Sequence, residues 1–465
     1  MFDKIYFLIN NPVIEPLGVM QLIASLKKEG HDIGIIRIDK EDPFVILNEG
    51  NFILLYSVIT GSHKYFANLN YRLKYLHGKG RLFSIFGGPH PTYFPQYINE
   101  QGIDAICRGE ADESLPYLIN QIKKGYYYDN SKSFWFKLDD GIIKNETYPL
   151  CQDLDKLPFA DRELLYQNKS NRDNPIKNFM ASLGCLYNCS YCFNCSFKQL
   201  YKGQKTLRWH SPEYLIDEIL QVKKKYPLKL IFFQDDMFAF KPAWLNNFLS
   251  LYSQKINLPF HCQLRVESIN KDTLQSLQQA GCSSVTFAIE TANSFIRQKL
   301  LRRNMTNEQM VTTAKLCHKI GLKFRTENMI GLPGETKKDI YETLKLNIKC
   351  KPTLGWCSIY QPYPGTDLSR YTSSIGLIDK DIDQIKDNFF ESTVLKFPKK
   401  HRRFINNIQK FFSTIVRYPW VLPIIKIIIK IPENRFFYRF SNWHRQKSYN
   451  KKLYSIKRRN NDIRI

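Results

Sequence analysis

Short apolar runs alternate with helical patterns along two long stretches of this chain. In the first stretch, the runs KIYFLIN, DIGIIRI, FILLYSV and RLFSIFGG are separated by segments with helical periodicity. In the second, six similar runs alternate with predicted helices such as Pro212–Lys225 and Asn307–Ile320. Because a crossover between parallel strands usually contains a helix, this alternation predicts α/β architecture with parallel sheets.

The two stretches predict two different sheets. Residues 1–125 are expected to form a Rossmann-like, doubly wound parallel sheet, and residues 176–395 a partial (β/α)6 TIM-like barrel. Residues 126–175 are polar and irregular, and they are expected to act as a linker with a few extended segments. Residues 396–465 mix apolar residues with Lys and Arg, which predicts a basic amphipathic helical region at the carboxyl-terminal end.

Positive charge is concentrated in that last region. The chain has 68 Lys and Arg against 43 Asp and Glu, a net charge of +25, and 19 of the basic residues but only two acidic ones lie in residues 396–465. Such a balance favours an acidic partner, although a Lys-, Asn- and Ile-rich bias from an AT-rich genome also explains it. Two interpretations stay open for this tail: an interfacial element on a membrane, or a helical cap whose lysines point to solvent.

The cysteine content and the amino-terminal residues bear on the compartment. The opening residues MFDKIYFLINNP read as a buried strand, without a charged leader or a cleavage site. No stretch reaches the ~20 apolar residues that a spanning helix needs. The 11 cysteines are an odd number and three lie close together, which favours metal binding over a disulfide framework. These features predict a cytoplasmic protein, with peripheral contact at the inner membrane face as the alternative location.

Three cysteines follow the predicted strand NFMASLG directly. Cys185, Cys189 and Cys192 have the spacing C-x3-C-x2-C. Three thiolates on one loop can bind three irons of a cubane cluster and leave the fourth iron open to a small molecule. Cys195 extends the run to four cysteines, so the spacing alone also allows a four-cysteine zinc site or a closed cluster.

This loop, with Tyr191 before its last cysteine, resembles the signature of the radical S-adenosylmethionine (SAM) superfamily. Later motifs agree with it in order and spacing, at Gln234–Asp236, Arg265, Phe287–Thr291 and Asn328–Glu335. The resemblance implies a [4Fe-4S] cluster on Cys185, Cys189 and Cys192. It also implies SAM contacts from Tyr191, Asp235, Asp236, Arg265, Glu290, Ile330 and Gly331.

The resemblance implies a first chemical step as well. SAM chelates the open iron, and one electron from the reduced cluster cleaves a C–S bond to give a 5′-deoxyadenosyl radical. An external one-electron donor, flavodoxin or ferredoxin, is then a required partner. Because oxygen destroys such clusters, an anaerobic setting is expected.

The first stretch resembles the cobalamin-binding domain that precedes the barrel in one radical SAM subfamily. The residues that carry this resemblance are Pro16–Gly18, Thr60–Gly61, Gly87–Thr92 and Asp104–Glu110. The resemblance implies cobalamin contacts from Gly18, Thr60, Gly61, Gly87, Gly88, Pro89 and His90. An Asp-x-His-x-x-Gly motif is absent, so cobalamin would be held without a lower histidine, and His90 is expected to shape its loop instead. An α/β domain without a cofactor is the alternative.

A radical SAM enzyme with cobalamin most often methylates an unreactive carbon, using the methyl group of methylcobalamin. The expected function is therefore a cobalamin-dependent methyltransferase that acts on a small molecule or a lipid. Ring closure, carbon-skeleton rearrangement and, in a different class, nucleic-acid binding with a structural cluster are the alternatives. No nucleic-acid-binding signature accompanies the charge, which disfavours the last. Tyr363, in Gln361–Thr366, is expected to contact substrate or cobalamin, with simple packing as the alternative.

Overall fold

The computed structural model describes residues 2–10, 14–78, 80–239, 241–378, 385 and 388–447. The chain divides into two compact units, which are described separately below. Unit 1 contains Met1–Asp173, Phe193–Trp209 and Tyr363–Gly365. Unit 2 contains Asn174–Cys192, His210–Pro362 and Thr366–Ile465.

Unit 1 is built on a seven-stranded sheet with the order β2-β1-β3-β4-β5-β6-β7. The first five strands are parallel, which confirms the predicted parallel α/β sheet. Its strands are β1 (Lys4–Ile9), β2 (Ile33–Arg37), β3 (Phe52–Ser57), β4 (Leu82–Gly87), β5 (Ala105–Cys107), β6 (Phe134–Leu138) and β7 (Gly141–Lys144). The segment β10 (Arg208–Trp209) also belongs to this unit.

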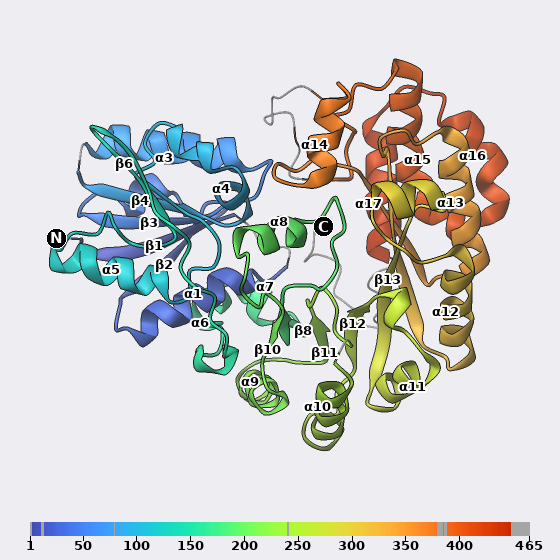
Figure 1. Ribbon diagram of the computed structural model, residues 1–465, viewed down its shortest axis with the longest axis horizontal. Helices are drawn as coiled ribbons and strands as arrows, with labels where there is room; N and C mark the ends of the chain where they lie inside the picture. The colour runs from blue at the N-terminus through green and yellow to red at the C-terminus, as the bar shows by residue number, and fades with distance from the viewer. Residues whose placement is uncertain are drawn as a thin grey trace. The chain divides into compact units, whose positions relative to one another are not determined.

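Helices cover both faces of the unit 1 sheet. In Figure 1, α3 lies on one side of the sheet, and α1 and α5 lie together on the other. Because both faces are covered, the central strands are buried and read as continuous apolar runs. The helices are α1 (Leu17–Lys28), α2 (Pro43–Ile46), α3 (His63–His77), α4 (Pro89–Tyr93), η1 (Pro95–Asn99), α5 (Ser114–Lys124), η2 (Leu154–Lys156), α6 (Glu163–Tyr166), α7 (Lys169–Arg172) and α8 (Phe193–Leu200).

The segment predicted to be a linker with a few extended segments contributes two strands to this sheet. Strands β6 and β7 form a hairpin, and β6 pairs antiparallel with β5, with Trp135 opposite Ile106. The turn signal is present in the sequence as Asp139-Asp140-Gly141 between two short apolar runs. The residues on either side are strongly polar, so the average composition of the segment does not reveal the two short apolar strands.

Unit 2 is built on a six-stranded parallel sheet with the order β15-β14-β13-β12-β11-β8. Successive strands of the chain are neighbours, as a partial (β/α) barrel requires. The strands are β8 (Ile176–Phe179), β11 (Leu230–Phe233), β12 (Phe260–Leu264), β13 (Cys282–Glu290), β14 (Lys323–Ile330) and β15 (Leu354–Ile359), with the short β9 (Ser182–Leu183) after β8.

The crossover helices of unit 2 line one side of its sheet (Figure 1). Several begin with side-chain caps: Thr306 and Thr336 each form a capping box at the start of α12 and α13. The helices are α9 (Pro212–Lys225), α10 (Pro242–Lys255), η3 (Val266–Ser268), α11 (Lys271–Gln279), η4 (Ile296–Leu300), α12 (Asn307–Lys319), α13 (Lys337–Cys350) and α14 (Asp367–Ser374).

The basic carboxyl-terminal region is helical as far as it is described. It forms α15 (Lys399–Arg417), η6 (Pro419–Val421), α16 (Leu422–Ile428) and α17 (Arg435–Lys447), and residues 448–465 lie outside the described part. Helix α15 packs on β15, where Val416 lies over Gly355 and Gln409 donates to the Cys357 carbonyl at 2.8 Å. Among the described helices, none is long and apolar enough to cross a membrane.

Candidate functional site

The three predicted cluster ligands lie on one loop of unit 2, directly after β9. Cys189 is buried, Cys185 and Cys192 are partly buried, and none of the three forms a disulfide bond. The backbone N–H of Cys192 donates to the Cys189 carbonyl at 3.1 Å, which closes a turn between these two ligands. No three His, Cys, Asp or Glu side chains of the described ranges form a group that could hold a metal ion. The loop therefore carries its thiols in a turn rather than in a preformed, closed coordination group.

Cys189 lies beside a buried arginine. Arg265, directly after β12, donates from Nη1 to the Sγ of Cys189 at 3.2 Å. Its guanidinium lies 3.5 Å from the ring centroid of Tyr187 and forms two hydrogen bonds with the Glu267 carboxylate. A cation that donates to sulfur favours the thiolate, and it also tunes the reduction potential of an iron–sulfur cluster. The predicted site residue Arg265 is thus placed next to a predicted cluster ligand.

A second arginine, which the sequence does not single out, connects the cysteine loop to the end of β13. Arg303 Nη1 donates to the Tyr191 hydroxyl at 3.0 Å and lies 4.0 Å from the Sγ of Cys189. The same guanidinium is 3.7 Å from the Glu290 carboxylate. Tyr191 in turn donates to Glu290 Oε1 at 2.6 Å. Two predicted SAM-binding residues, Tyr191 and Glu290, are therefore brought into direct contact.

The backbone at Glu290 is held in an unfavourable conformation. Its φ of 62° is left-handed, and the pairing of β13 with β14 shifts register between Ala288 and Glu290. A left-handed non-glycine residue costs about 1–3 kcal/mol, and such strain is concentrated at functional sites. The irregular strand end directs the Glu290 carboxylate toward Tyr191 and Arg303.

Burial acts in opposite directions on the pKa values of Glu290 and Arg303. Burial raises the pKa of Glu290, although Arg303 and the Tyr191 hydroxyl oppose the shift. Burial alone would lower the pKa of Arg303, but Tyr191, Glu290 and Cys189 outweigh it and raise the pKa. Arg303 therefore stays cationic beside the cysteine loop.

One donor atom of Arg303 bears on whether the site could hold an additional anionic group. Its Nε is buried and has no hydrogen-bond partner among the described residues. A buried donor without a partner costs about 1–3 kcal/mol, so native structures nearly always provide one. A thiolate-bound cluster or the carboxylate of SAM would supply that acceptor. The donors around Cys189 therefore fit the cluster and the sulfonium cofactor that the sequence predicts.

The predicted SAM residues Asp235 and Asp236 differ in their surroundings. Asp235 is fully buried, and its carboxylate accepts from the Ala181 N–H at 3.0 Å and from the Ser182 hydroxyl at 2.5 Å. Burial raises its pKa to about 6, against the pull of these hydrogen bonds. Asp235 thus anchors β9, which leads into the cysteine loop, whereas the neighbouring Asp236 is exposed.

The loop after β14 is closed by a buried carboxyl group. Glu335 Oε2 accepts from the N–H of Gly331 at 2.6 Å and of Leu332 at 3.3 Å. Burial raises the pKa of Glu335 to about 8, so the group is largely protonated near neutral pH. The side chain of Ile330 packs into a core cluster shared with α15, and its carbonyl accepts from the Tyr360 N–H. Any contact from Ile330 to a cofactor would therefore come from its backbone.

In unit 1, the strand order fixes where a ligand should bind. The order β2-β1-β3-β4-β5 places a switch point between β1 and β3, where α1 leads toward one edge and α3 toward the other. In open parallel sheets, the ligand crevice lies outside the carboxyl ends of the strands at this point. The predicted loop Asn10–Gly18 follows β1 there, but its residues 11–13 lie outside the described part.

The fold does not require two of the predicted cofactor-binding glycines. Among the described residues, a Cβ built on Gly18 meets nothing within 4 Å, and one on Gly87 makes only ordinary contacts at 3.7 and 3.8 Å. Because glycine inside a helix or strand costs about 0.5–1 kcal/mol relative to alanine, another requirement has to account for it. A bulky ligand close to the backbone is such a requirement, which fits the predicted cobalamin contacts.

Gly88, in contrast, is required by the fold itself. Its φ is +91°, and an added Cβ would lie 2.8 Å from the backbone N of Val58. Gly78 has a similar backbone, with φ +80°, but an added Cβ there meets no atom of the described part of the chain within 4 Å. We expect Gly88→Ala to lower the free energy of unfolding by about 1–3 kcal/mol more than Gly78→Ala, because only the first adds overpacking to backbone strain. Chemical denaturation of both variants checks this, and equal losses would contradict it.

His90 is packed inside unit 1. It is 1% exposed, its Nδ1 lies 2.9 Å from the Thr60 hydroxyl, and its ring stacks on His63 at 4.2 Å. His63 Nδ1 accepts from the Gly61 N–H at 3.1 Å, and Pro89 begins α4. These contacts tie together the predicted loops after β3 and β4, as expected for a residue that shapes its loop.

Tyr363 belongs to unit 1, whereas the cluster cysteines belong to unit 2. Its ring lies 5.8 Å from that of Phe193, which stacks on Tyr93 at 4.6 Å. Tyr93 ends α4, immediately after the predicted cobalamin loop. Tyr363 thus packs against Phe193, and its contact with substrate or cobalamin stays a prediction.

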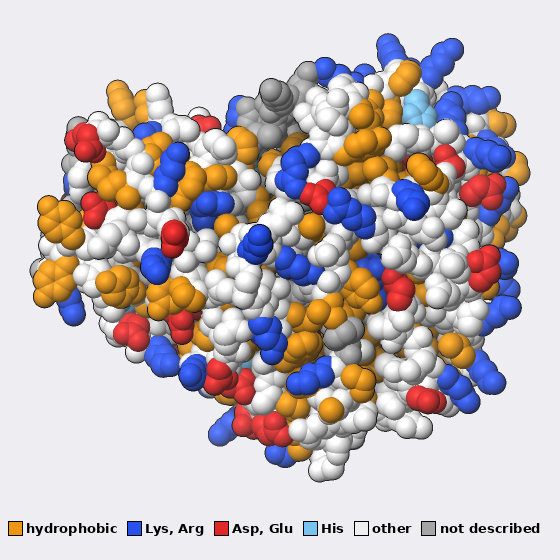
Figure 2. Space-filling view, in the orientation of Figure 1, with side chains coloured by type: hydrophobic (Ala, Val, Ile, Leu, Met, Phe, Trp, Pro, Cys, Tyr) orange, Lys and Arg blue, Asp and Glu red, His pale blue; other side chains and the backbone are white. Residues whose placement is uncertain are grey.

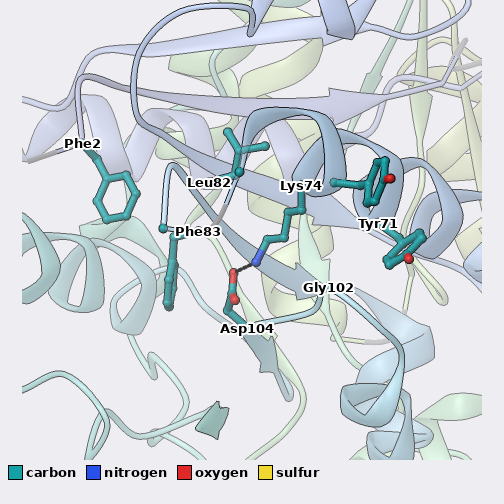
Figure 3. Close-up of a pocket in the computed structure, with 10 residues that line it drawn as sticks. Phe2, Tyr71, Lys74, Leu82, Phe83, Gly102 and Asp104 are labelled. Carbon is teal, nitrogen blue, oxygen red and sulfur yellow. Dashed lines mark hydrogen bonds and ion pairs between the residues drawn. The ribbon is translucent and has the colours of Figure 1, made fainter. Parts of the chain in front are cut away.

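A cavity of about 330 Å³ in unit 1 lies away from these loops. Leu82, Gly102 and Asp104 line it at the amino-terminal ends of β4 and β5, opposite the predicted ligand crevice. Figure 3 shows the lining residue Lys74 directed at Asp104, with which it forms an ion pair. Asp104 also accepts from the Ser84 N–H at 2.7 Å. The charged groups that line this cavity therefore already interact with other residues of unit 1.

Comparisons with known proteins agree with this geometry. The family model of the radical SAM superfamily matches residues 181–346, the segment that contains all three cluster cysteines. The uncharacterized methyltransferase PH0819 of Pyrococcus horikoshii is 28% identical over 382 residues, which cover 78% of this chain and 79% of that protein.

Two solved structures share the fold at low sequence identity. The cobalamin-dependent SAM radical enzyme OxsB, solved with aqua-cobalamin and SAM, has a TM-score of 0.68 at 17% identity over 96% of this chain and 72% of its own. The radical SAM methyltransferase TsrM of Kitasatospora setae, solved with cobalamin and a [4Fe-4S] cluster, has a TM-score of 0.64 at 14% identity, over 80% and 75%. The family match shows that residues 181–346 form a radical SAM domain, the class of domain that binds a [4Fe-4S] cluster and SAM, and the two solved structures show that the chain shares their fold.

Proposed function

We propose that this protein is a cobalamin-dependent radical SAM methyltransferase that methylates an unactivated carbon of a small molecule or a lipid. The observation that carries the proposal is the presence, in one chain, of a radical SAM domain and a parallel sheet with its switch point between β1 and β3. The likeness to OxsB over 96% of the chain supports the same pairing of cofactors. The similarity to PH0819 and to TsrM supports methyl transfer.

Each residue of the unit 2 site has a proposed task. Cys185, Cys189 and Cys192 would hold the cluster, and Arg265 and Arg303 would donate to its sulfur atoms and tune its potential. Glu290, Tyr191 and Asp236 are proposed to contact SAM. Asp235 is proposed to act as a positioning residue, because its hydrogen bonds to Ala181 and Ser182 hold the strand that leads into the loop.

The unit 1 loops have a separate proposed task. Gly18 and Gly87 would let cobalamin approach the backbone, while Thr60, Gly61, Gly88, Pro89 and His90 keep the loops after β3 and β4 in shape. Cofactors of these classes supply radical generation and methyl transfer, and the protein supplies binding, orientation and exclusion of water. An external one-electron donor, flavodoxin or ferredoxin, is proposed to reduce the cluster.

The fate of SAM tests this function without knowledge of the substrate. The anaerobic protein, loaded with cobalamin and chemically reduced, is mixed with SAM, and the nucleoside products are quantified by mass spectrometry. A methyltransferase is expected to release S-adenosylhomocysteine, about one per bound cobalamin, in addition to 5′-deoxyadenosine. Formation of 5′-deoxyadenosine alone would overturn methyl transfer and favour ring closure or rearrangement. The absence of both products would reject the proposed function.

A further inference from the structure

The surface of the carboxyl-terminal helices carries an exposed apolar stripe. Trp420, Ile424, Ile427 and Ile431 are 73%, 56%, 69% and 51% exposed. Ile424 and Ile427 lie three residues apart on one side of α16, Trp420 lies in the preceding turn η6, and Ile431 follows the end of α16. We call these four residues the α16 stripe. Single exposed apolar residues are common on proteins, but four large ones close together in one short segment of the chain are not.

The other side of the same segment is already occupied. Ile425 and Ile429 are buried in a core cluster with Phe411 and Ile415 of α15. Packing within unit 2 therefore fixes the helix and turns the α16 stripe outward. The side of this helix that belongs to the protein core is the one that contacts α15, so the stripe is a second, solvent-facing side.

Basic residues flank the stripe. Lys426, Lys430, Arg417 and Arg435 are exposed, and Lys426 lies 5.1 Å from the ring of Tyr341. Figure 2 shows Lys and Arg side chains, with a few Asp and Glu, among hydrophobic ones along the edge where α16 lies. In the described part of this tail, Glu433 is the one acidic residue, and its carboxylate accepts from Asn406 at 2.8 Å. The face is thus apolar at its centre and cationic at its border.

The neighbouring helix α17 repeats this combination. Phe436 and Trp443, which are seven residues apart and hence on one helix face, are both exposed. Arg439 is exposed on the same helix, and Lys447 Nζ lies 4.9 Å from the ring of Trp443. Tryptophan and long basic side chains are favoured at the boundary between water and lipid, where an apolar body and a polar end are both accommodated.

The positive charge around the stripe helps to decide which kind of partner could cover it. A second copy of the chain would bring the same cations against one another, which is repulsive. A nucleic acid would satisfy the cations but leave the isoleucines without an apolar partner. An anionic bilayer satisfies both, because its headgroups attract Lys and Arg and its acyl boundary accepts the apolar side chains.

We propose that the α16 stripe and its basic border dock this protein on an anionic membrane surface. Each apolar side chain inserts at the level of the headgroups and the upper acyl chains, and the flanking cations contact lipid phosphates. The attachment is peripheral and reversible. It does not depend on the reaction, so its failure would leave the proposed methyl transfer untouched.

Vesicle flotation with the full-length, anaerobically purified protein tests the proposal. We expect flotation with vesicles that contain phosphatidylglycerol, little flotation with pure phosphatidylcholine, and loss of binding as salt is raised. Ile424→Gln/Ile427→Gln should weaken binding by at least about tenfold, because two large apolar side chains no longer insert. Lys430→Gln/Arg435→Gln should weaken it by about 25-fold, at about fivefold per charge.

Matched variants elsewhere on the molecule serve as controls. Val45→Gln/Leu76→Gln removes two apolar side chains that are 71% and 65% exposed, and Lys124→Gln/Lys224→Gln removes two exposed charges. Both pairs should bind anionic vesicles like the parent, and thermal unfolding should show that all four double variants are folded. Equal binding of the Ile424→Gln/Ile427→Gln variant and the parent would overturn the proposal. So would binding that ignores lipid charge, or a concentration-dependent dimer that only the stripe variant abolishes.

Discussion

Replacing Cys185, Cys189 and Cys192 together by alanine is expected to reduce the iron of the anaerobically purified protein from about four atoms per chain to nearly none. The three side chains are the ligands that the loop offers, and each would bind a different iron. The same protein should lose the visible absorption of the cluster and its cleavage of SAM. Iron and sulfide analysis, with the ultraviolet-visible spectrum, measures the loss.

Cys195→Ala is the matched control for the triple substitution. Cys195 lies on α8 in unit 1, and this unit holds α8 by its own contacts: the Tyr201 hydroxyl accepts from the Glu110 N–H at 3.0 Å, and Ser196 donates to the Gly365 carbonyl at 2.5 Å. The side chain of Cys195 is buried. We therefore expect Cys195→Ala to keep its full iron content. Loss of iron in this variant would support the closed four-cysteine site that the spacing also allows.

Arg303→Met is expected to lower the free energy of unfolding of unit 2 by about 3–5 kcal/mol, because it leaves the buried Glu290 carboxylate without its cation. The Arg303 side chain is 6% exposed, and it also supports Tyr191 and the carbonyl of Ala288. The cluster should be lost more readily as well, since the guanidinium lies 4.0 Å from the Sγ of Cys189. Anaerobic chemical denaturation and the rate of iron loss to a chelator measure the two effects.

The neighbouring residue provides an internal comparison. Arg302 is half exposed and pairs with Asp367 at the surface, so Arg302→Met should cost no more than about 1 kcal/mol. Both substitutions remove an arginine from the same loop and keep a long unbranched side chain. Equal effects of the two variants would contradict the role assigned to Arg303.

The sequence predicted the features whose residues are close together in the chain. The three cysteines lie within eight residues on one loop, so their spacing alone suggested the cluster. The strand and helix alternation predicted both parallel sheets, because a crossover helix leaves a local periodic signal. The hairpin of β6 and β7 was missed, since a short Asp-Asp-Gly turn is a weak signal within a polar segment.

The contacts that shape the site could not be predicted in the same way. Arg303 and Arg302 are adjacent and chemically identical, and only tertiary packing buries one and exposes the other. Tyr191 and Glu290 are 99 residues apart, so their hydrogen bond depends on how the cysteine loop meets the end of β13. The α16 stripe could not be predicted from the sequence for a different reason. In WVLPIIKIIIKI nearly every position is apolar, so periodicity could not separate the buried face from the exposed one.

The central claim is that this chain holds both an iron–sulfur cluster and cobalamin. Its most direct test is the metal content of the full-length protein, expressed and purified without oxygen from cells supplied with cobalamin. We expect about four irons and about one cobalt per chain, with the visible absorption of both cofactors. Iron without cobalt would contradict the two-cofactor account and leave a radical SAM enzyme without a methyl carrier, and zinc in place of iron would contradict the cluster itself.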